Sequence, residues 1–401
     1  LLDGNVHFTL FPAVDRQEGV ERYAGFMRRL ADMVLYYDGS LKAEHGTGRN
    51  MAPFVEKEWG GKIYRVMKEI KRLFDPEDIL NPGVILNDDP DVFVRNLKQM
   101  PLAGEEIDRC IECGFCEMQC PSRHLTLTPR QRIVAYRGLV SMQEAGETAS
   151  ARYKALEKAF RYAGEATCAA DGLCAASCPV GIDTGALIKK LRWQRHTALA
   201  DKLASVVARH FGIVTAVLPP FLSSFHAVAR MAGYKPVETF GSLLFRLTGH
   251  RLPLWTRYTP AGARRLSFQS ETARPGQPEM VYFPACITRT MGPSADYEEQ
   301  AGVTERMIEL LHRAGFTIRY PSAIHSLCCG MAFSSKGFRK QAAFKQAQLN
   351  EALLSASEGG RLPVLCDMSP CLLHMRETLD TRLRLYEPVE FITTYMLDKL
   401  T

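Results

Sequence analysis

The most constraining feature of the sequence is a run of four closely spaced cysteines followed by a proline. Cys110, Cys113, Cys116 and Cys120 are spaced C-x2-C-x2-C-x3-C, and Pro121 follows. In such a run three thiolates wrap one iron–sulfur cube, and the fourth reaches a second cube. Zinc sites instead pair two C-x2-C units. The run therefore predicts a loop folded around an iron–sulfur cluster, with a second cluster nearby.

A second run copies the end of the first but has an aspartate where its second cysteine is expected. It consists of Cys168, Asp171, Cys174 and Cys178, with Pro179 after it. Two such runs are expected to exchange their fourth ligands. The first cluster would then be bound by Cys110, Cys113, Cys116 and Cys178. The second would be bound by Cys120, Cys168, Cys174 and the residue at position 171.

Position 171 leaves several alternatives open. The Asp171 carboxylate could bind the fourth iron through oxygen, or that iron could be absent, which gives a [3Fe-4S] cluster. A third alternative is that the fourth iron binds water and Asp171 lies beside it. Asp171 could also be only a turn residue before Gly172. An intact pair of clusters would carry single electrons and offer no open site for a substrate.

Composition predicts a globular protein of two or three domains in a reducing compartment. The chain has 401 residues, of which 46% are hydrophobic and 23% are charged, and its net charge of +6 is too diffuse to indicate a nucleic-acid partner. Its twelve cysteines lie among helix-like segments, which favours metal ligation over a disulfide scaffold. The opening "LLDGNVHF" begins as if inside a strand, so we expect a fragment that lacks an N-terminal part.

Sequence patterns divide the chain into four parts and predict an α+β and α/β multidomain fold. Residues 1–100 and 279–401 alternate strand and helix patterns, with helices expected over 21–37 and about 54–73. Residues 101–200 contain both cysteine runs and a helix capped by Asp183 or Thr184. Residues 201–278 form an apolar helical connector. Within it, Pro219 and Pro220 predict that residues 211–229 form two buried or interfacial helices separated by a loop. The alternative is that this segment docks on a membrane surface.

Three sets of motifs resemble known families. "GNVHF", "AEHGTGRN" and "FDPEDILNPG" resemble the C-terminal part of the FAD-linked oxidases, the D-lactate and D-2-hydroxyglutarate dehydrogenase type. The cysteine runs resemble the fused ferredoxin-type module of that family. "YFPACITRTMGP", "LCCGMAFSSKGF" and "CDMSPC" resemble the first repeat of a cysteine-rich CCG domain. Together they are similar to the flavin and iron–sulfur D-lactate dehydrogenases, whose FAD domain lies upstream and whose second CCG repeat lies downstream.

The resemblance implies a hydroxy-acid site in the first part of the chain. His7 and Glu44 match metal ligands of the family, and the expected ion is divalent, such as zinc or manganese. The metal would bind the substrate carboxylate and hydroxyl as a Lewis acid. His45 is then the candidate base for the hydroxyl proton, because imidazole has a pKa near neutrality. Asn81 could contact FAD, although a turn that ends a helix explains it equally well.

The resemblance also gives the last five cysteines a candidate role. They are Cys286, Cys328, Cys329, Cys366 and Cys371. In relatives, such cysteines hold a further iron–sulfur centre or a redox site that faces a quinone. The family pattern ends in C-x2-C, whereas four residues separate Cys366 from Cys371 here. The alternative is a set of free buried cysteines.

The resemblance implies FAD- and cluster-dependent oxidation of a D-2-hydroxy acid, with D-lactate as the first expectation. Electrons would leave through two [4Fe-4S]-type clusters to a quinone or another carrier. The alternative is a non-catalytic electron-transfer subunit of a glycolate oxidase or glycerol-3-phosphate dehydrogenase complex. We expect a cytoplasmic protein, with peripheral contact to the inner membrane as a further expectation.

Overall fold

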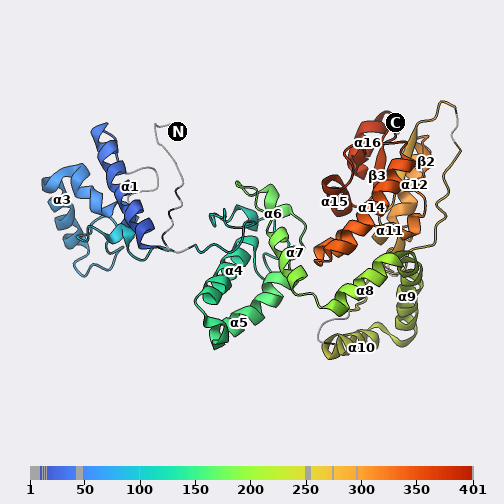
Figure 1. The fold of residues 1–401 in the computed structure, drawn as a ribbon, viewed down its shortest axis with the longest axis horizontal. Helices are drawn as coiled ribbons and strands as arrows, with labels where there is room; N and C mark the ends of the chain where they lie inside the picture. The colour runs from blue at the N-terminus through green and yellow to red at the C-terminus, as the bar shows by residue number, and fades with distance from the viewer. Residues whose placement is uncertain are drawn as a thin grey trace. The chain divides into compact units, whose positions relative to one another are not determined.

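The computed structural model describes residues 10, 12, 14, 16–41, 48–98, 100–248, 254–272, 275–294 and 297–399. The chain divides into two compact units, and Figure 1 labels many of their helices and strands. The first comprises Leu1–Asp108 and Ile133–Glu157, and the second comprises Arg109–Arg132 and Lys158–Thr401. The four-part division expected from sequence stays a prediction. The strand expected at "GNVHF" lies outside the described residues.

The two longest helices of the first unit are α1 (Gln17–Tyr36) and α3 (Val55–Phe74). The structure confirms both close to their predicted bounds, with the short α2 (Gly48–Met51), η1 (Ala52–Phe54) and η2 (Val92–Val94) beside them. The core contains Ala24, Met27, Ala31, Phe54 and Phe93. The outer side of α3 leaves apolar side chains exposed, among them Ile63, Val66 and Ile70.

Short helices separate the two cysteine runs. In chain order they are η3 (Phe115–Glu117), α4 (Pro129–Glu144), η4 (Glu147–Ala149), α5 (Ala151–Phe160), the π-type η5 (Arg161–Ala166), α6 (Leu173–Ala176) and α7 (Thr184–Gln194). Asp183 caps α7 as predicted, because its Oδ1 accepts a hydrogen bond of 2.7 Å from the Gly185 N–H.

The connector contains three helices, α8 (Ala198–Arg209), α9 (Phe211–Ala232) and α10 (Tyr234–Leu247). The predicted break at Pro219 and Pro220 is wrong, because α9 continues through both prolines. Each proline removes one N–H from the helix, so the Thr215 and Ala216 carbonyls lose their helical donors. Tertiary packing holds the helix together: residue 262 approaches the Pro219 carbonyl so closely that only glycine fits there.

The C-terminal part is a parallel α/β sheet covered on both faces. Its described strands are β1 (Glu279–Phe283), β2 (Thr317–Arg319), β3 (Val364–Cys366) and β4 (Leu385–Tyr386), in the order β2-β1-β3-β4. Helices α12 (Val303–Arg313) and α16 (Pro388–Tyr395) pack on one face. Helices α14 (Arg339–Ala356) and α15 (Ser369–Thr378) pack on the other. The predicted fold class is confirmed.

The strand order places a switch point between β1 and β3, because the chain crosses from one side of β1 to the other there. Ligand sites of open α/β sheets lie at such points, beyond the carboxyl ends of the strands. Three short helices, α11 (Cys286–Thr290), η6 (Ile324–Ser326) and α13 (Met331–Ser335), lie at this end of the sheet, and η7 (Leu397–Lys399) ends the described chain.

Candidate functional site: two cysteine-lined centres

The two cysteine runs have the same backbone conformation. In the first run, the residues two and four positions after Cys110 have positive φ angles, 57° at Glu112 and 90° at Gly114. The second run repeats this after Cys168, with 53° at Ala170 and 78° at Gly172. Residues in the left-handed backbone conformation turn the chain sharply, so that successive thiols can face one point.

Asp171 therefore occupies the place in the second loop that Cys113 occupies in the first. Its Oδ1 accepts a hydrogen bond of 3.2 Å from the Leu173 N–H, so the carboxylate supports the turn. Asp171 also lines a small cavity together with Cys120, Cys168 and Cys174. These four residues are the set predicted for the second cluster. The structure brings them together, while the ligand role of Asp171 stays a prediction.

The first run is partly open to solvent. Cys113 is exposed, Cys110, Cys116 and Cys178 are half-buried, and Cys120 is buried. Cys116 lies within electrostatic range of Cys110 and of Cys174, and burial raises the pKa of Cys116 to about 11. Soft thiolates at these positions suit iron–sulfur ligation.

The geometry of the described residues differs from that of a single-ion site. Among them, no three Cys, His, Asp or Glu side chains converge as one metal ion requires. Ligands of one zinc ion must meet at a point about 2.3 Å from each sulfur. Ligands of a cube bind different irons and lie further apart.

Arg132 is buried against the second cysteine set. Its guanidinium donates to Cys120 Sγ at 3.5 Å, to Ser122 Oγ at 2.9 Å and to the Gly164 carbonyl at 2.8 Å. Burial acts to raise the pKa of Cys120, but the hydrogen bonds from Ser122 and Arg132 outweigh it, and the pKa lies below that of a free thiol. The same two donors would favour the thiolate form in which cysteine binds iron.

Arg192 on α7 connects the second cysteine run to the C-terminal sheet domain. Its guanidinium donates to the Cys168 carbonyl at 2.8 Å and to the Ser335 carbonyl at the end of α13. The His196 ring stacks on Phe338, with ring centroids 3.9 Å apart. These contacts lie within the second compact unit, so they place the second cysteine run beside the helix that follows Cys329.

The five C-terminal cysteines meet at the switch point of the sheet. Cys286 follows β1, Cys366 ends β3, and Cys328 and Cys329 lie on the loop before α13. The Sγ atoms of Cys286 and Cys328 are 3.9 Å apart. Cys371 lies in the first turn of α15 and contacts Cys329, so the wider spacing to Cys366 still brings it to the cluster of thiols.

Four thiols of this group, here called the five-cysteine site, are buried, and the fifth, Cys286, is half-buried. The hydrogen bond with Cys328 and then burial raise the pKa of Cys286 far above that of a free thiol. Burial does the same for Cys366. Two buried cations, Arg289 and Lys345, are within electrostatic range of Cys286 and Cys328. Positive charge favours the thiolate state that a metal centre would require.

Asp367 fixes the loop that carries Cys286. Its buried carboxylate accepts hydrogen bonds from the Ala285 N–H at 2.7 Å, the Tyr282 hydroxyl at 2.8 Å and the Thr288 hydroxyl at 2.9 Å. Burial raises the pKa of Asp367, and these donors oppose that shift. The loops after β1 and β3 are thereby tied together at the switch point.

The hydroxy-acid site can be followed only in part. His7, Glu44 and His45 lie outside the described residues. Asn81 is exposed, has a φ of 46°, and lines a groove of about 860 Å³ with apolar side chains of α3. Asn87 and charged side chains, among them Lys68 and Asp88, line the same groove, so apolar and polar groups alternate around it. The sequence has no G-x-G-x-x-G phosphate loop, so these residues fit only part of FAD.

Sequence reasoning missed the charged residues that organise both centres. Arg132, Arg192, Arg289, Lys345 and Asp367 are all polar side chains in buried or half-buried places. The sequence gives a signal only for Asp367, which directly follows a strand-ending cysteine. The arginines lie on helices whose polar faces ordinarily point to solvent.

Two family matches agree with this arrangement. Residues 1–85 match the FAD linked oxidases, C-terminal domain, and residues 106–182 match the 4Fe-4S dicluster domain. The chain therefore joins the C-terminal domain of a FAD-linked oxidase to a dicluster iron–sulfur domain, and the resemblance found in the sequence is confirmed for both.

Curated relatives match over about 80 residues each. A probable mitochondrial D-lactate dehydrogenase of Danio rerio is 34% identical over a stretch that covers 21% of this chain and 17% of the relative. A D-2-hydroxyglutarate dehydrogenase of Stutzerimonas stutzeri is also 34% identical, over 21% of this chain and 18% of the relative. The glycolate oxidase subunit GlcD of Bacillus subtilis is 32% identical over 20% of this chain and 17% of its own. The chain thus spans less than a fifth of these relatives. No solved structure matches it.

Proposed function

We propose that this chain belongs to a flavin- and iron–sulfur-dependent dehydrogenase that oxidises a D-2-hydroxy acid, with D-lactate as the first candidate. The observation that carries the proposal is the order of the two matched domains, in which the FAD-linked oxidase domain comes before the iron–sulfur domain. Cysteines of the second domain line a common cavity, which supports a cluster there. FAD would accept a hydride and the clusters would pass single electrons when bound.

The substrate-side roles rest on the family resemblance. His7 and Glu44 would hold a divalent ion such as zinc or manganese, and the ion would orient the carboxylate and hydroxyl of the acid. His45 would take the hydroxyl proton. Asn81 would contact the flavin from the groove beside α3.

The cysteine sets supply the ligands for an outward route. Cys110, Cys113, Cys116 and Cys178 would bind one cluster, and Cys120, Cys168, Cys174 and Asp171 the other. From Cys168 the route continues over Arg192 to Ser335, then along α13 to Cys328 and Cys329. There the five-cysteine site would hold a third iron–sulfur centre, which passes electrons to a quinone or another carrier.

The test is anaerobic stopped-flow mixing of the full protein, with FAD and clusters in place, with D-lactate and separately with L-lactate. We expect the D enantiomer to bleach the flavin first and reduce the clusters afterwards. Replacing Cys168 with serine should leave the bleaching intact and stop the second step. Cluster reduction by a partner flavoprotein, without any response to hydroxy acids, would instead favour the electron-transfer subunit.

We further propose that the protein works in the cytoplasm, docked on the inner membrane through α8, α9 and α10. Each helix exposes an apolar stripe at helical spacing. The stripes are Leu199, Leu203 and Val206 on α8, Ile213, Val217, Phe221, Val228 and Met231 on α9, and Phe240, Leu243 and Leu247 on α10. Residues 198–265 also contain nine Lys or Arg against two Asp or Glu. A cationic surface with apolar stripes suits an anionic lipid surface.

Helix α9 would lie on the bilayer rather than cross it. In the part of the chain that is described, it is the one helix long and apolar enough to span a membrane. Its opposite side, however, buries Phe211, Leu222, His226 and Ala229 in the protein. A helix with one face committed to the protein core has only its other face available for lipid.

Vesicle flotation tests this docking. The protein should float with vesicles that contain phosphatidylglycerol, less so with phosphatidylcholine alone, and binding should weaken as salt is raised. The double variant Val217→Glu with Phe221→Glu should abolish flotation. Leu125→Glu is the matched control, because Leu125 is 82% exposed but lies outside the stripes. Equal flotation of both variants would contradict the docking surface.

A further inference from the structure

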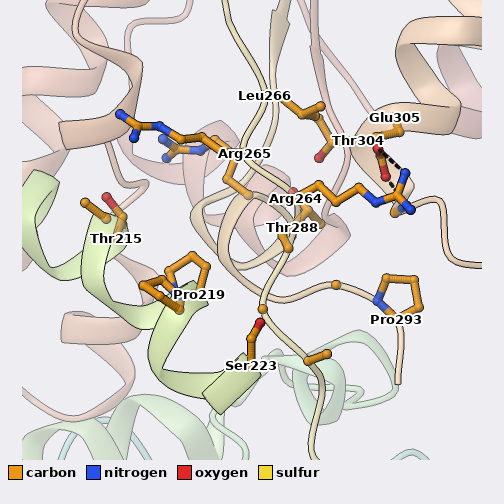
Figure 2. Close-up of a pocket in the computed structure, with 18 of the residues that line it drawn as sticks. Thr215, Pro219, Ser223, Arg264, Arg265, Leu266, Thr288, Pro293, Thr304 and Glu305 are labelled. Carbon is orange, nitrogen blue, oxygen red and sulfur yellow. Dashed lines mark hydrogen bonds and ion pairs between the residues drawn. The ribbon is translucent and has the colours of Figure 1, made fainter. Parts of the chain in front are cut away.

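A cavity of about 630 Å³ (Figure 2) is lined in part by α11, the helix that begins at Cys286. One wall is α9, with Thr215, Pro219 and Ser223. The opposite wall is formed by residues 261–266, here called the strap, and by Thr288 and Arg289 of α11. Figure 2 shows Pro219 and Ser223 on the side of α9 that faces the strap. The volume is in the range of sites that enclose a small organic molecule.

The cavity is built into the fold by backbone pairing. The Ala263 N–H donates to the Thr290 carbonyl at 3.1 Å, and the Gly292 N–H donates to the Ala261 carbonyl at 2.8 Å. Between them, a side chain at Gly262 would come within 2.0 Å of the Pro219 carbonyl oxygen. The strap is thus held between α9 and the loop after α11, and the walls are fixed on both sides.

Nitrogen donors are prominent in the lining. Arg264, Arg265, Arg289 and His325 contribute cationic or imidazole side chains, and the hydroxyls of Thr215, Ser223, Thr288 and Thr304 can donate or accept. Glu305 is the lone carboxylate in the lining and lies 3.9 Å from Arg264. Prolines, alanines, Leu266 and Phe268 supply the remaining apolar surface. The ligand should therefore be apolar, with oxygen atoms that accept hydrogen bonds.

Two residues of α11 connect the cavity to the thiols. Thr288 lines it and lies two residues after Cys286. Arg289 lines it as well and donates to the Leu327 carbonyl at 2.7 Å, directly before Cys328. A molecule in the cavity would lie within short electron-transfer reach of the five-cysteine site.

We propose that this cavity binds the head group of a lipid-soluble quinone, which is the electron acceptor of the protein. The inference rests on the proposed electron route through the cysteine sites. Arg265 and His325 would donate to the ring carbonyl oxygens, and the prolines of α9 would contact the ring. The apolar tail would leave along α9 toward its exposed stripe and the lipid.

The reduction of the quinone is balanced in electrons and protons. The quinone takes two electrons, delivered one at a time from the five-cysteine site, and two protons from water, and it leaves as the quinol. The new hydroxyl groups of the quinol need acceptors. Thr215 and Ala216 belong to the same wall, and Pro219 and Pro220 cannot donate to the carbonyls of these two residues, so those carbonyls are available as acceptors.

Two neighbouring serines give a matched pair of variants. Ser223 lines the cavity, whereas Ser224, one position further on α9, does not, and both side chains are exposed. Ser223→Trp should fill the cavity, and Ser224→Trp places the same bulk outside it. Arg265→Gln removes a donor without adding bulk, so the test does not depend on one variant.

The first measurement is photoaffinity labelling with an azido-quinone, followed by peptide mapping. It needs neither FAD nor a hydroxy acid. We expect the label on peptides that contain residues 215–223 or 261–268, with strong loss in Ser223→Trp and retention in Ser224→Trp. Labels elsewhere, or equal labelling of the two tryptophan variants, would overturn the proposal.

The second measurement is reoxidation of the dithionite-reduced protein by decylubiquinone, with ferricyanide as an oxidant that does not need the cavity. Ser223→Trp and Arg265→Gln should each slow the quinone reaction by about tenfold or more, the loss of roughly one good interaction, and leave the ferricyanide reaction unchanged. Unchanged quinone rates, or equal slowing with both oxidants in both variants, would overturn the site. Because no hydroxy acid takes part, failure here is distinct from failure of the proposed dehydrogenase activity.

Discussion

Replacing Arg132 with glutamine should lower the reduction potential of the second cluster. Arg132 is almost fully buried, and its guanidinium is 3.5 Å from Cys120 Sγ. Adding an electron to a cluster adds negative charge, which a nearby cation stabilises. Glutamine keeps a polar side chain but removes the charge, so the reduced state loses that stabilisation.

The size of the shift follows from Coulomb's law. A guanidinium about 6 Å from the centre of the added charge, at an effective dielectric constant of about 20, contributes about 3 kcal/mol. For a one-electron couple, a tenfold change in equilibrium constant is about 59 mV, so the potential should fall by about 130 mV. The first cluster should shift less, because its ligands lie further from Arg132.

The assay is an anaerobic redox titration followed by EPR, with Arg152→Gln as the control. Arg152 is exposed on α5, so solvent screens its charge and the substitution should leave both potentials unchanged. A folded Arg132→Gln protein with wild-type potentials for both clusters would refute the reasoning. It would mean that Cys120 does not ligate a cluster near this guanidinium.

Three further predictions concern other parts of the chain. Gly337→Ala should lower the melting temperature and slow electron transfer to the five-cysteine site, because the φ of Gly337 is 87° and a Cβ there would lie 2.6 Å from the backbone nitrogen of Trp193. Gly315→Ala is the control: its φ is similar but the space around it is open, so this variant should lower the melting temperature without slowing electron transfer. Asp171→Cys should raise the iron count or change the EPR spectrum if position 171 is a ligand, and unchanged values would leave Asp171 as a turn residue. For Asp75, the hydrogen bond from Lys71 and then that from the Leu80 N–H lower the carboxyl pKa, so its stabilising effect is present above pH 3.8 and is lost as pH falls through the lower folded pKa. Asp75→Asn should therefore lower the melting temperature near neutral pH but not in strong acid; a pH-independent difference would contradict this.

The sequence predicts the ligand-bearing loops well because their chemistry is local. The spacing of Cys110 to Cys120 determines a cluster-wrapping loop, and the strand-into-cysteine pattern at Cys366 places a thiol at a sheet edge. The second positive-φ pair at Ala170 and Gly172 was not predictable, because alanine rarely adopts that conformation.

Long-range contacts account for what the sequence does not reveal. The break expected in α9 fails because the strap packs on Pro219, some forty residues away in the chain. The burial of Arg132 depends on η5 and on the second cysteine run, which no local pattern indicates. The convergence of Cys371 with Cys329 likewise requires the helix α15 to begin where it does.

The unequal burial of the cysteines has a consequence for the protein in air. Oxidative damage to thiolates and clusters follows exposure, and Cys113 is exposed whereas Cys328 is fully buried under Ala208 and Phe211. The first cluster should therefore be lost first during aerobic handling and the five-cysteine site last. An iron count on air-exposed protein would then reflect how far this damage has gone and not the iron content of the intact protein. Measuring the intact iron content requires oxygen-free preparation.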